Sequence, residues 1–109
     1  MSVTFFDANN PAQFNADGDQ IGGGVEVNFS NTNAAFVLEL MGIYEEDAAF
    51  LIGEMSGEEF RKNIMRGLSN VEIMMTANSN LADAHLSVVK SRLERLATVF
   101  ADTVLVRWE

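Results

Sequence analysis

The sequence predicts an α+β domain in which a small sheet of about three strands carries about three helices on one face. Two observations predict this class. Short runs rich in β-branched and aromatic residues occur near both ends of the chain, at residues 3–6, 25–29 and 103–108. Between them, apolar residues recur with helical spacing, at residues 34–41, 57–68 and 81–101. The length of 109 residues suits a single domain over residues 1–109 and is too short for two.

The strands are predicted from the alternation of apolar and polar residues. Val25, Val27 and Phe29 would share the face that meets the core, because successive side chains of a strand point to opposite sides. The corresponding residues of the last strand are Val104, Val106 and Trp108. That strand follows a long helix, so we expect it to run parallel to residues 25–29.

The helix boundaries are predicted from capping residues. Residues 30–33 supply N-cap types before the first helix, Gly42 suits a left-handed C-cap, and Ile43 would cover that end. Ser56 and Glu59 have the spacing of a capping box at the start of the second helix. The third helix carries the strongest periodicity, with apolar residues spaced 3, 4, 3, 4: Leu86, Val89, Leu93, Leu96 and Phe100.

Three segments lack a clear pattern. Residues 7–24 are rich in Gly, Asn and Asp and read as a polar loop, near the upper length for an ordinary connection. Residues 44–55 are ambiguous, because their short apolar run suits a strand as well as a helix. Residues 74–80 read as an exposed loop.

Charge is distributed unevenly along the chain. Residues 1–60 hold eleven acids and no Lys or Arg, for −11, whereas residues 61–109 hold seven bases and five acids, for +2; the sum is the net charge of −9. An acidic half repels nucleic acid, so we expect no direct nucleic-acid binding. It could attract a basic partner, or it could simply keep the surface soluble.

Cysteine is absent, which excludes disulfides, thiolate nucleophiles and Cys-based metal sites and fits the reducing cytoplasm. The N-terminus lacks the basic start and apolar run of a secretory signal. No stretch reaches about 18 consecutive apolar residues, so we expect no transmembrane helix.

One pattern resembles a calcium-binding loop. Asn15, Asp17, Asp19 and Glu26 occupy positions 1, 3, 5 and 12 of an EF-hand type loop, where oxygen ligands are needed. The match fails at position 6, where Gln20 replaces the glycine of the sharp turn, and no helix is predicted on either side. The alternative is an acidic turn held by Asx-type hydrogen bonds.

A second candidate site is the polar turn formed by Ser30, Asn31, Thr32 and Asn33. Free backbone N–H groups at a helix start can hold an anion or a small polar ligand. The alternative is that these side chains satisfy the N–H groups themselves, as N-cap residues do.

No catalytic residue is predicted. His85 is the only histidine, it falls in a helix, and no nucleophile is evident beside it. Adjacent acids such as Glu58 and Glu59 are better read as helix-start charges than as the opposed carboxylates of acid–base catalysis. An enzyme is therefore the least supported class.

The run from Val27 to Ala35, followed by Leu38 to Gly42, resembles the opening of a family of small uncharacterised bacterial proteins. Its members show a strand, an Asn-rich turn, a helix ending in Leu-Gly and an acidic capped helix. Residues 53–60 are similar to that second signature, and residues 93–108 to the Leu-rich helix and Val-Val-Trp-like end of the family. The shared motifs are structural, so the resemblance implies no activity and no cofactor.

We therefore expect a non-catalytic, acidic protein–protein interaction module that works as a homodimer or as the partner of a basic protein. The acidic half, the missing catalytic sets and the apolar stripe of residues 86–100 favour this hypothesis. Met65, Met74 and Met75 cluster near the second helix, and methionines either fill a core or form adaptable binding surfaces. The alternative is a small-ligand or Ca²⁺-binding domain that uses residues 15–33.

Overall fold

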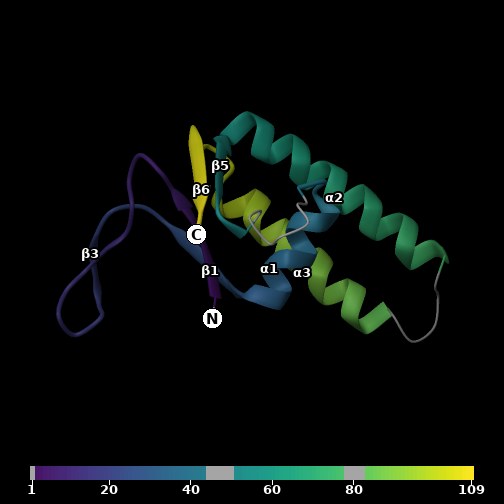
Figure 1. Cartoon of the computed structure of the whole chain (residues 1–109), viewed down its shortest axis with the longest axis horizontal. Coiled ribbons are helices and arrows are strands. Elements are labelled where there is room, and N and C mark those ends of the chain that lie inside the picture. Colours follow the sequence, from purple (N-terminus) through teal and green to yellow (C-terminus); the bar gives the residue numbers. More distant parts are fainter. Residues whose placement is uncertain (1, 44–50, 78–82) are drawn as a thin grey trace.

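The computed structural model describes residues 2–43, 51–77 and 83–109, with residues 83 and 84 described in their backbone only. A four-stranded antiparallel sheet has the spatial order β4–β1–β6–β5. Its strands are β1 (Ser2–Asp7), β4 (Glu26–Ser30), β5 (Gly53–Ser56) and β6 (Leu105–Trp108). The helices packed against it are α1 (Asn31–Leu40), α2 (Gly57–Ala77) and α3 (Asp83–Val99), as Figure 1 shows. The predicted α+β class is confirmed.

The central strand β1 aligns the large apolar side chains of the sheet. Phe5 lies opposite Val27 of β4 and opposite Trp108 of β6, and Trp108 in turn lies opposite Gly53 of β5. Residues paired across strands point to the same face of a sheet. Val27, Phe5 and Trp108 therefore stand side by side under the helices, each with at most 2% of its surface exposed.

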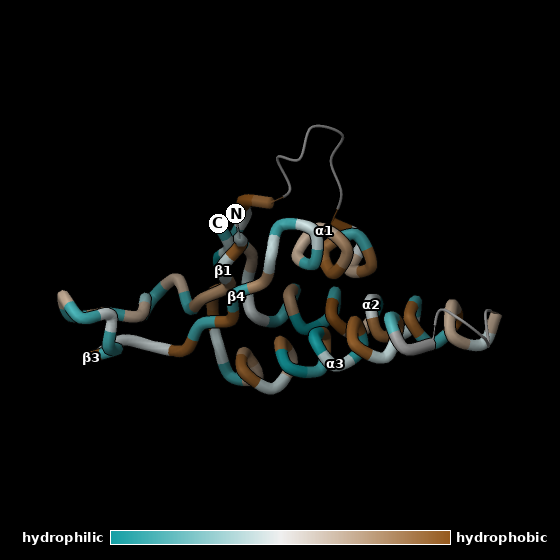
Figure 2. The backbone as a smooth tube through the Cα atoms, turned by 90° about the horizontal axis from the view of Figure 1, so that it is seen from below, coloured by the Kyte–Doolittle hydropathy of each residue, from teal (hydrophilic) through white to brown (hydrophobic). Residues whose placement is uncertain are grey.

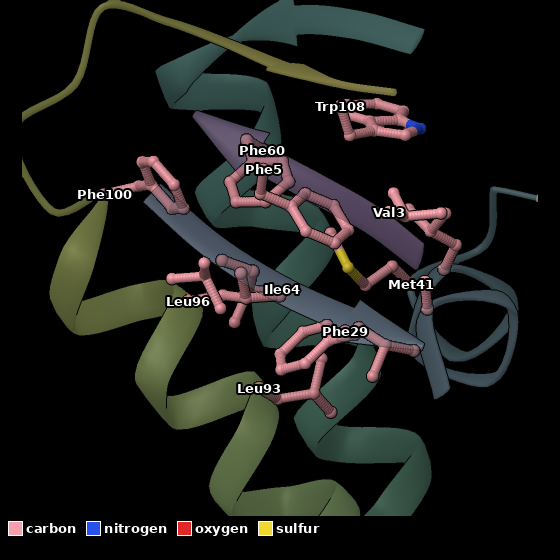
Figure 3. Close-up of a cluster of buried hydrophobic side chains, with 14 of the residues drawn as sticks. Val3, Phe5, Phe29, Met41, Phe60, Ile64, Leu93, Leu96, Phe100 and Trp108 are labelled. Carbon is pink, nitrogen blue, oxygen red and sulfur yellow. The ribbon is translucent and has the colours of Figure 1, made fainter. Parts of the chain in front are cut away.

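Aromatic rings form the middle of the core (Figure 3). The centroid of the Phe5 ring lies 5.8 Å from that of Trp108 and 6.0 Å from that of Phe60. Phe60 in turn meets Phe100 edge-on, with centroids 5.8 Å apart and an interplanar angle of 89°. Such tilted and edge-on pairs are favoured by the ring quadrupoles, which adds to the burial of apolar surface.

Helices α2 and α3 lie side by side and run in opposite directions (Figure 1). All five residues of the predicted 86–100 stripe are buried, with exposures of 0–2%. The stripe packs within the core and is not available to a partner of the folded chain. The inference that this stripe contributes to an intermolecular interface is therefore wrong.

The predicted caps are present. The Ser30 Oγ accepts a hydrogen bond from the Asn33 N–H at 3.3 Å, and the Ser56 Oγ accepts one from the Glu59 N–H at 3.1 Å. Gly42 has a φ of +85°, and the N–H of Ile43 reaches back to the Leu38 carbonyl at 2.9 Å. Only glycine takes this left-handed conformation without strain, which explains why α1 ends there.

The last strand runs in the predicted direction. Strands β4 and β6 are both antiparallel to β1 and hence parallel to each other, with β1 between them. However, Val25 and Val104 lie outside the strands and are 50% and 75% exposed, so their predicted places in the core are wrong. Each stands just before a strand begins, where neighbouring strands and helices no longer cover the chain.

The three segments without a clear pattern have different outcomes. Within residues 7–24 the structure contains a small hairpin, β2 (Gln13–Phe14) paired with β3 (Gln20–Gly22). Residues 53–56 form the strand β5, while residues 44–50 lie outside the described residues. Residues 74–77 continue α2 instead of forming a loop, because half-buried Met74 and Met75 still pack against the core; residues 78–80 are not described.

Of the helices in the described residues, none combines the length and apolar content that a bilayer crossing requires.

Candidate functional site

The predicted metal ligands are only partly brought together. Asn15, Asp17 and Asp19 share the tip of the β2–β3 hairpin, whereas Glu26 lies on β4 opposite Phe6. The Asn15 Oδ1 accepts hydrogen bonds from the Asp17 N–H at 3.0 Å and from the Asp19 N–H at 2.9 Å. Nowhere in residues 2–43, 51–77 and 83–109 do three His, Asp or Glu side chains gather as a metal site would need. Calcium binding stays a prediction.

The polar turn before α1 is used as a helix cap. The Ser30 hydroxyl accepts from the Asn33 N–H, while Asn31, Thr32 and Asn33 belong to the first turn of the helix. Thr32 is exposed, and Asn31 and Asn33 are half-buried. Binding of a small polar ligand at this turn is not tested by these contacts and also stays a prediction.

The β2–β3 hairpin projects from the sheet away from the helices, and we call residues 12–23 the arm (Figures 1 and 2). Its apolar side chains are exposed, Phe14 by 48% and Ile21 by 67%. At its base the Gly24 N–H donates to the Asn10 carbonyl at 2.7 Å. A two-stranded hairpin without a core beneath it is only marginally stable in water. These exposed apolar side chains therefore contribute little to the stability of the chain itself.

A hollow lies between α1 and α2. It has a volume of about 380 Å³, and its lining is mainly apolar: Phe36, Glu39, Leu40, Asn70, Ile73 and Met74. The Asn70 Nδ2 donates to the Leu40 carbonyl at 2.8 Å and thereby joins the end of α1 to α2. The His85 ring packs edge-on against Phe36 at 5.4 Å.

An uncharged row continues from this hollow along the exposed side of α2. Met65, Ser69, Ile73 and Ala77 follow one another at intervals of four residues, and all are exposed. Met65 and Ile73 each expose 65% of their surface. We call these four residues the α2 row. Residues four apart form one of the ridges by which α-helices pack into each other, so the row is shaped for a second helix.

A second surface lies on the other side of the molecule, between β4 and α3. A hollow of about 380 Å³ separates the edge of the sheet from the helix. Its lining combines the strand with two cations and an apolar side chain of the helix: Val27, Asn28, Phe29, Val88, Ser91, Arg92 and Arg95.

A sequence signal exists for the first surface but not for the second. Methionines near the second helix suit either a core or a binding surface, and the structure divides them: Met65 is exposed, whereas Met74 and Met75 are half-buried. The β4–α3 hollow joins segments about sixty residues apart, so only the folded chain could place them together.

Comparison of the chain with models of protein families, with curated proteins and with solved structures finds no match. The resemblance described above therefore assigns the chain to no family, and its function must be argued from these surfaces.

Proposed function

We propose that this chain is a non-catalytic protein–protein interaction module that forms a homodimer through the α2 row. The observation that carries the proposal is the uncharged row of Met65, Ser69, Ile73 and Ala77 on a helix whose other exposed positions include charged residues. Two exposed, large apolar side chains at helical spacing gain free energy when a second surface covers them.

The row is suited to a two-fold arrangement. If two copies of α2 cross antiparallel with the symmetry axis at Ser69, Met65 of each copy meets Ile73 of the other, because residue numbers on opposite sides of the axis are exchanged. The small Ser69 lies at the crossing point, where it lets the helices approach closely. The same symmetry keeps each flank of α2 beside the same flank of the other copy, so the exposed Arg66 would face Arg66 of the second copy and the exposed Glu72 would face its Glu72. These like charges lie at the solvent-exposed border of the row, where salt screens them.

Sedimentation velocity over a range of protein concentrations tests the proposal. We expect the wild-type chain to dimerise in about the micromolar range, because a single helix pair forms a small interface. The variant Ile73→Asp should remain a monomer, since two carboxylates would be buried beside methionines. Val104→Asp is the matched control, because Val104 is 75% exposed and lies beside Gly57 at the start of α2, outside the α2 row. A wild-type chain that stays monomeric at millimolar concentration would refute the proposal.

A charge exchange tests the symmetry itself. When wild-type chains are mixed with Arg66→Glu chains, mixed dimers should form in preference to dimers of one kind, because Arg66 of one copy then faces an acid at the same position of the other. Native mass spectrometry of the mixture measures the proportion of mixed dimers. A proportion no higher than random pairing gives would place the interface elsewhere.

A second candidate is favoured by the arm, which presents the exposed Phe14 and Ile21 behind the acidic tip of Asp17 and Asp19. This combination suits a basic partner with an apolar patch. NMR titration with a lysine-rich amphipathic peptide should shift arm signals in the wild type and not in a Phe14→Ser, Ile21→Ser variant. The calcium alternative is separate, and calorimetric titration with calcium tests it: binding that is lost in Asp17→Asn would establish it.

A further inference from the structure

The outer edge of β4, which no other strand of the described residues pairs with, offers backbone groups to a further strand. Thr4 of β1 exchanges both backbone hydrogen bonds with Glu109, at 3.0 and 3.2 Å, so its N–H and C=O face away from β4. Because these directions alternate along an antiparallel strand, Thr4 and its partner Asn28 form a non-hydrogen-bonded pair. The N–H and C=O of Asn28, and likewise those of Glu26, therefore point outward from the sheet edge.

A groove runs beside this edge. On its strand side lie residues 27–29, and on its helix side lie Val88, Ser91, Arg92 and Arg95, which follow the spacing of one helix face. Phe29, which lines the groove, points toward Leu93 of α3 (Figure 3). Extended peptides bind by strand addition where a sheet presents an exposed edge, and a groove beside that edge can receive their alternate side chains.

The two arginines give the groove a charge opposite to that of the chain as a whole. The other cations of this region have partners: Lys90 binds Glu72 at 2.6 Å, and Arg61 donates to two backbone carbonyls. Arg92 and Arg95 make no ion pair or side-chain hydrogen bond within the described residues. In a chain with a net charge of −9, two arginines one helical turn apart line one groove.

We infer that this groove binds an extended acidic segment of a partner protein, which adds to β4 as a further strand and sets alternate carboxylates against Arg92 and Arg95. Every second side chain of an added strand faces the helix layer, with a spacing of about 6.8 Å. The arginine side chains start about 4.5 Å apart along the helix axis and are long enough to match that spacing. Arginine is also the side chain best suited to hold a carboxylate in a two-point contact.

A second copy of this chain fits the groove poorly. If β4 paired with β4 of another copy, both α3 helices would lie on the same side of the joined sheet, and their arginines would face each other. Glu26 could not relieve this repulsion, because its side chain alternates with buried Val27 and points to the opposite face from α3. This inference goes beyond the α2 homodimer and uses a different surface.

Fluorescence anisotropy with a labelled, acetylated peptide of sequence Thr-Glu-Thr-Glu-Thr tests the inference. The central threonine would pair with Asn28, and the two glutamates would face the arginines. We expect the double variant Arg92→Gln, Arg95→Gln to bind about three- to thirtyfold more weakly, the loss expected for two exposed ion pairs. Lys62→Gln is the control for charge, because Lys62 is exposed on α2 and should leave binding unchanged.

Two altered peptides test the mode of binding without changing the protein. The glutamine version, Thr-Gln-Thr-Gln-Thr, should lose affinity, and N-methylation of the central threonine should abolish binding, because it removes the N–H that pairs with β4. Equal binding of the methylated peptide, or equal competition by inorganic phosphate, would overturn strand addition and leave a simple anion site.

The result is separable from the dimer proposal. The monomeric Ile73→Asp chain should bind the peptide as the wild type does, and the arginine variants should keep the wild-type oligomeric state. An oligomeric state that changes with Arg92 and Arg95 would instead make a second copy the occupant of the groove and overturn the inference.

Discussion

At the scale of single residues, Phe5 and Trp108 decide the shape of the core. Phe5 contacts rings from the sheet and from α2, so that side chains from β1, β6 and α2 are fixed against each other (Figure 3). Trp108 fits only because its neighbour on β5 has no side chain. A Cβ built on Gly53 would lie 2.7 Å from the Cε2 of the indole ring, closer than any real contact.

Substitution of Gly53 by alanine should therefore destabilise the protein. The added methyl group must displace the buried indole, and we expect a loss of about 1–3 kcal/mol in the free energy of unfolding, as for other overpacked cores. Urea denaturation followed by tryptophan fluorescence measures it. Gly22→Ala is the matched control, since its Cβ would meet only the flexible end of Gln13 at 3.2 Å. Equal stability of the two variants would show that Trp108 moves at little cost.

At the scale of helices and strands, the two ends of a helix can be satisfied in different ways. Ser30, Gly42 and Ser56 act on their own helices and are local in sequence. The C-terminal end of α3 has no basic residue in its last turn. Instead, the Arg61 Nη1 of α2 donates to the carbonyls of Phe100 and Thr103, both at 3.0 Å. A cation at this end also suits the negative pole of the helix dipole.

Replacement of Arg61 by glutamine should uncap α3. Two half-buried carbonyls would lose a charged donor, and we expect a loss of about 1.5–3 kcal/mol in stability. Thermal denaturation monitored by circular dichroism gives the change, with Lys62→Gln as the neighbouring control at an exposed position. Equal melting temperatures for the two variants would mean that water satisfies the two carbonyls as well as the guanidinium does.

An ion pair also joins α2 to α3, and it predicts a dependence on alkaline pH. The hydrogen bond from the Lys90 ammonium to Glu72, with the attraction between their charges, raises the pKa of Lys90 above its ordinary value of 10.5. The proton is held more tightly in the folded chain, so the stabilising effect is complete below pH 10.5 and is lost as the pH rises through the raised pKa. Comparison of the wild type with Lys90→Gln from neutral to strongly alkaline pH should show the difference in melting temperature disappearing. A difference in melting temperature that stays constant over this pH range would contradict the predicted role of the Lys90–Glu72 pair.

At the scale of the whole molecule, the arm is separate from the structure that the core maintains. The arm projects from the rest of the molecule (Figure 2). Its apolar side chains are exposed, and its base is closed by the hydrogen bond between Gly24 and Asn10. The charges are separated on the same scale, since the half of the chain that includes the arm carries all of the excess acid. The α2 row, the arm and the β4–α3 groove therefore present three different chemistries to partners.

Removal of the arm should leave the fold intact. When residues 13–22 are deleted, the free energy of unfolding should stay within about 1 kcal/mol of the wild-type value, since a shorter loop costs less entropy to close. No buried side chain is lost. Chemical denaturation measures stability, and the titration with the lysine-rich peptide measures the loss of the arm surface. A large drop in stability would mean that the arm supports the sheet.

The sequence by itself determined the fold class, the caps of α1 and α2 and the apolar face of α3, because these depend on neighbours within a few residues. It did not determine that β5 forms a strand, that α2 continues to Ala77, or that the third-helix stripe is wholly buried. Each of these outcomes depends on distant parts of the chain. Strand β5 forms because β6 offers it an edge to pair with, α2 continues because the core extends to Met74 and Met75, and the stripe of α3 is buried because the sheet and the other helices cover it.

The candidate surfaces likewise depend on contacts between distant segments. Exposure of Met65 and Ile73 follows from which side of α2 the core covers, and the pairing of Arg92 and Arg95 with the edge of β4 follows from the strand order. Local sequence fixes backbone preference because hydrogen bonds and caps act over a few residues. Which apolar or charged side chain remains uncovered is decided by contacts between distant segments, and only the tertiary structure contains them.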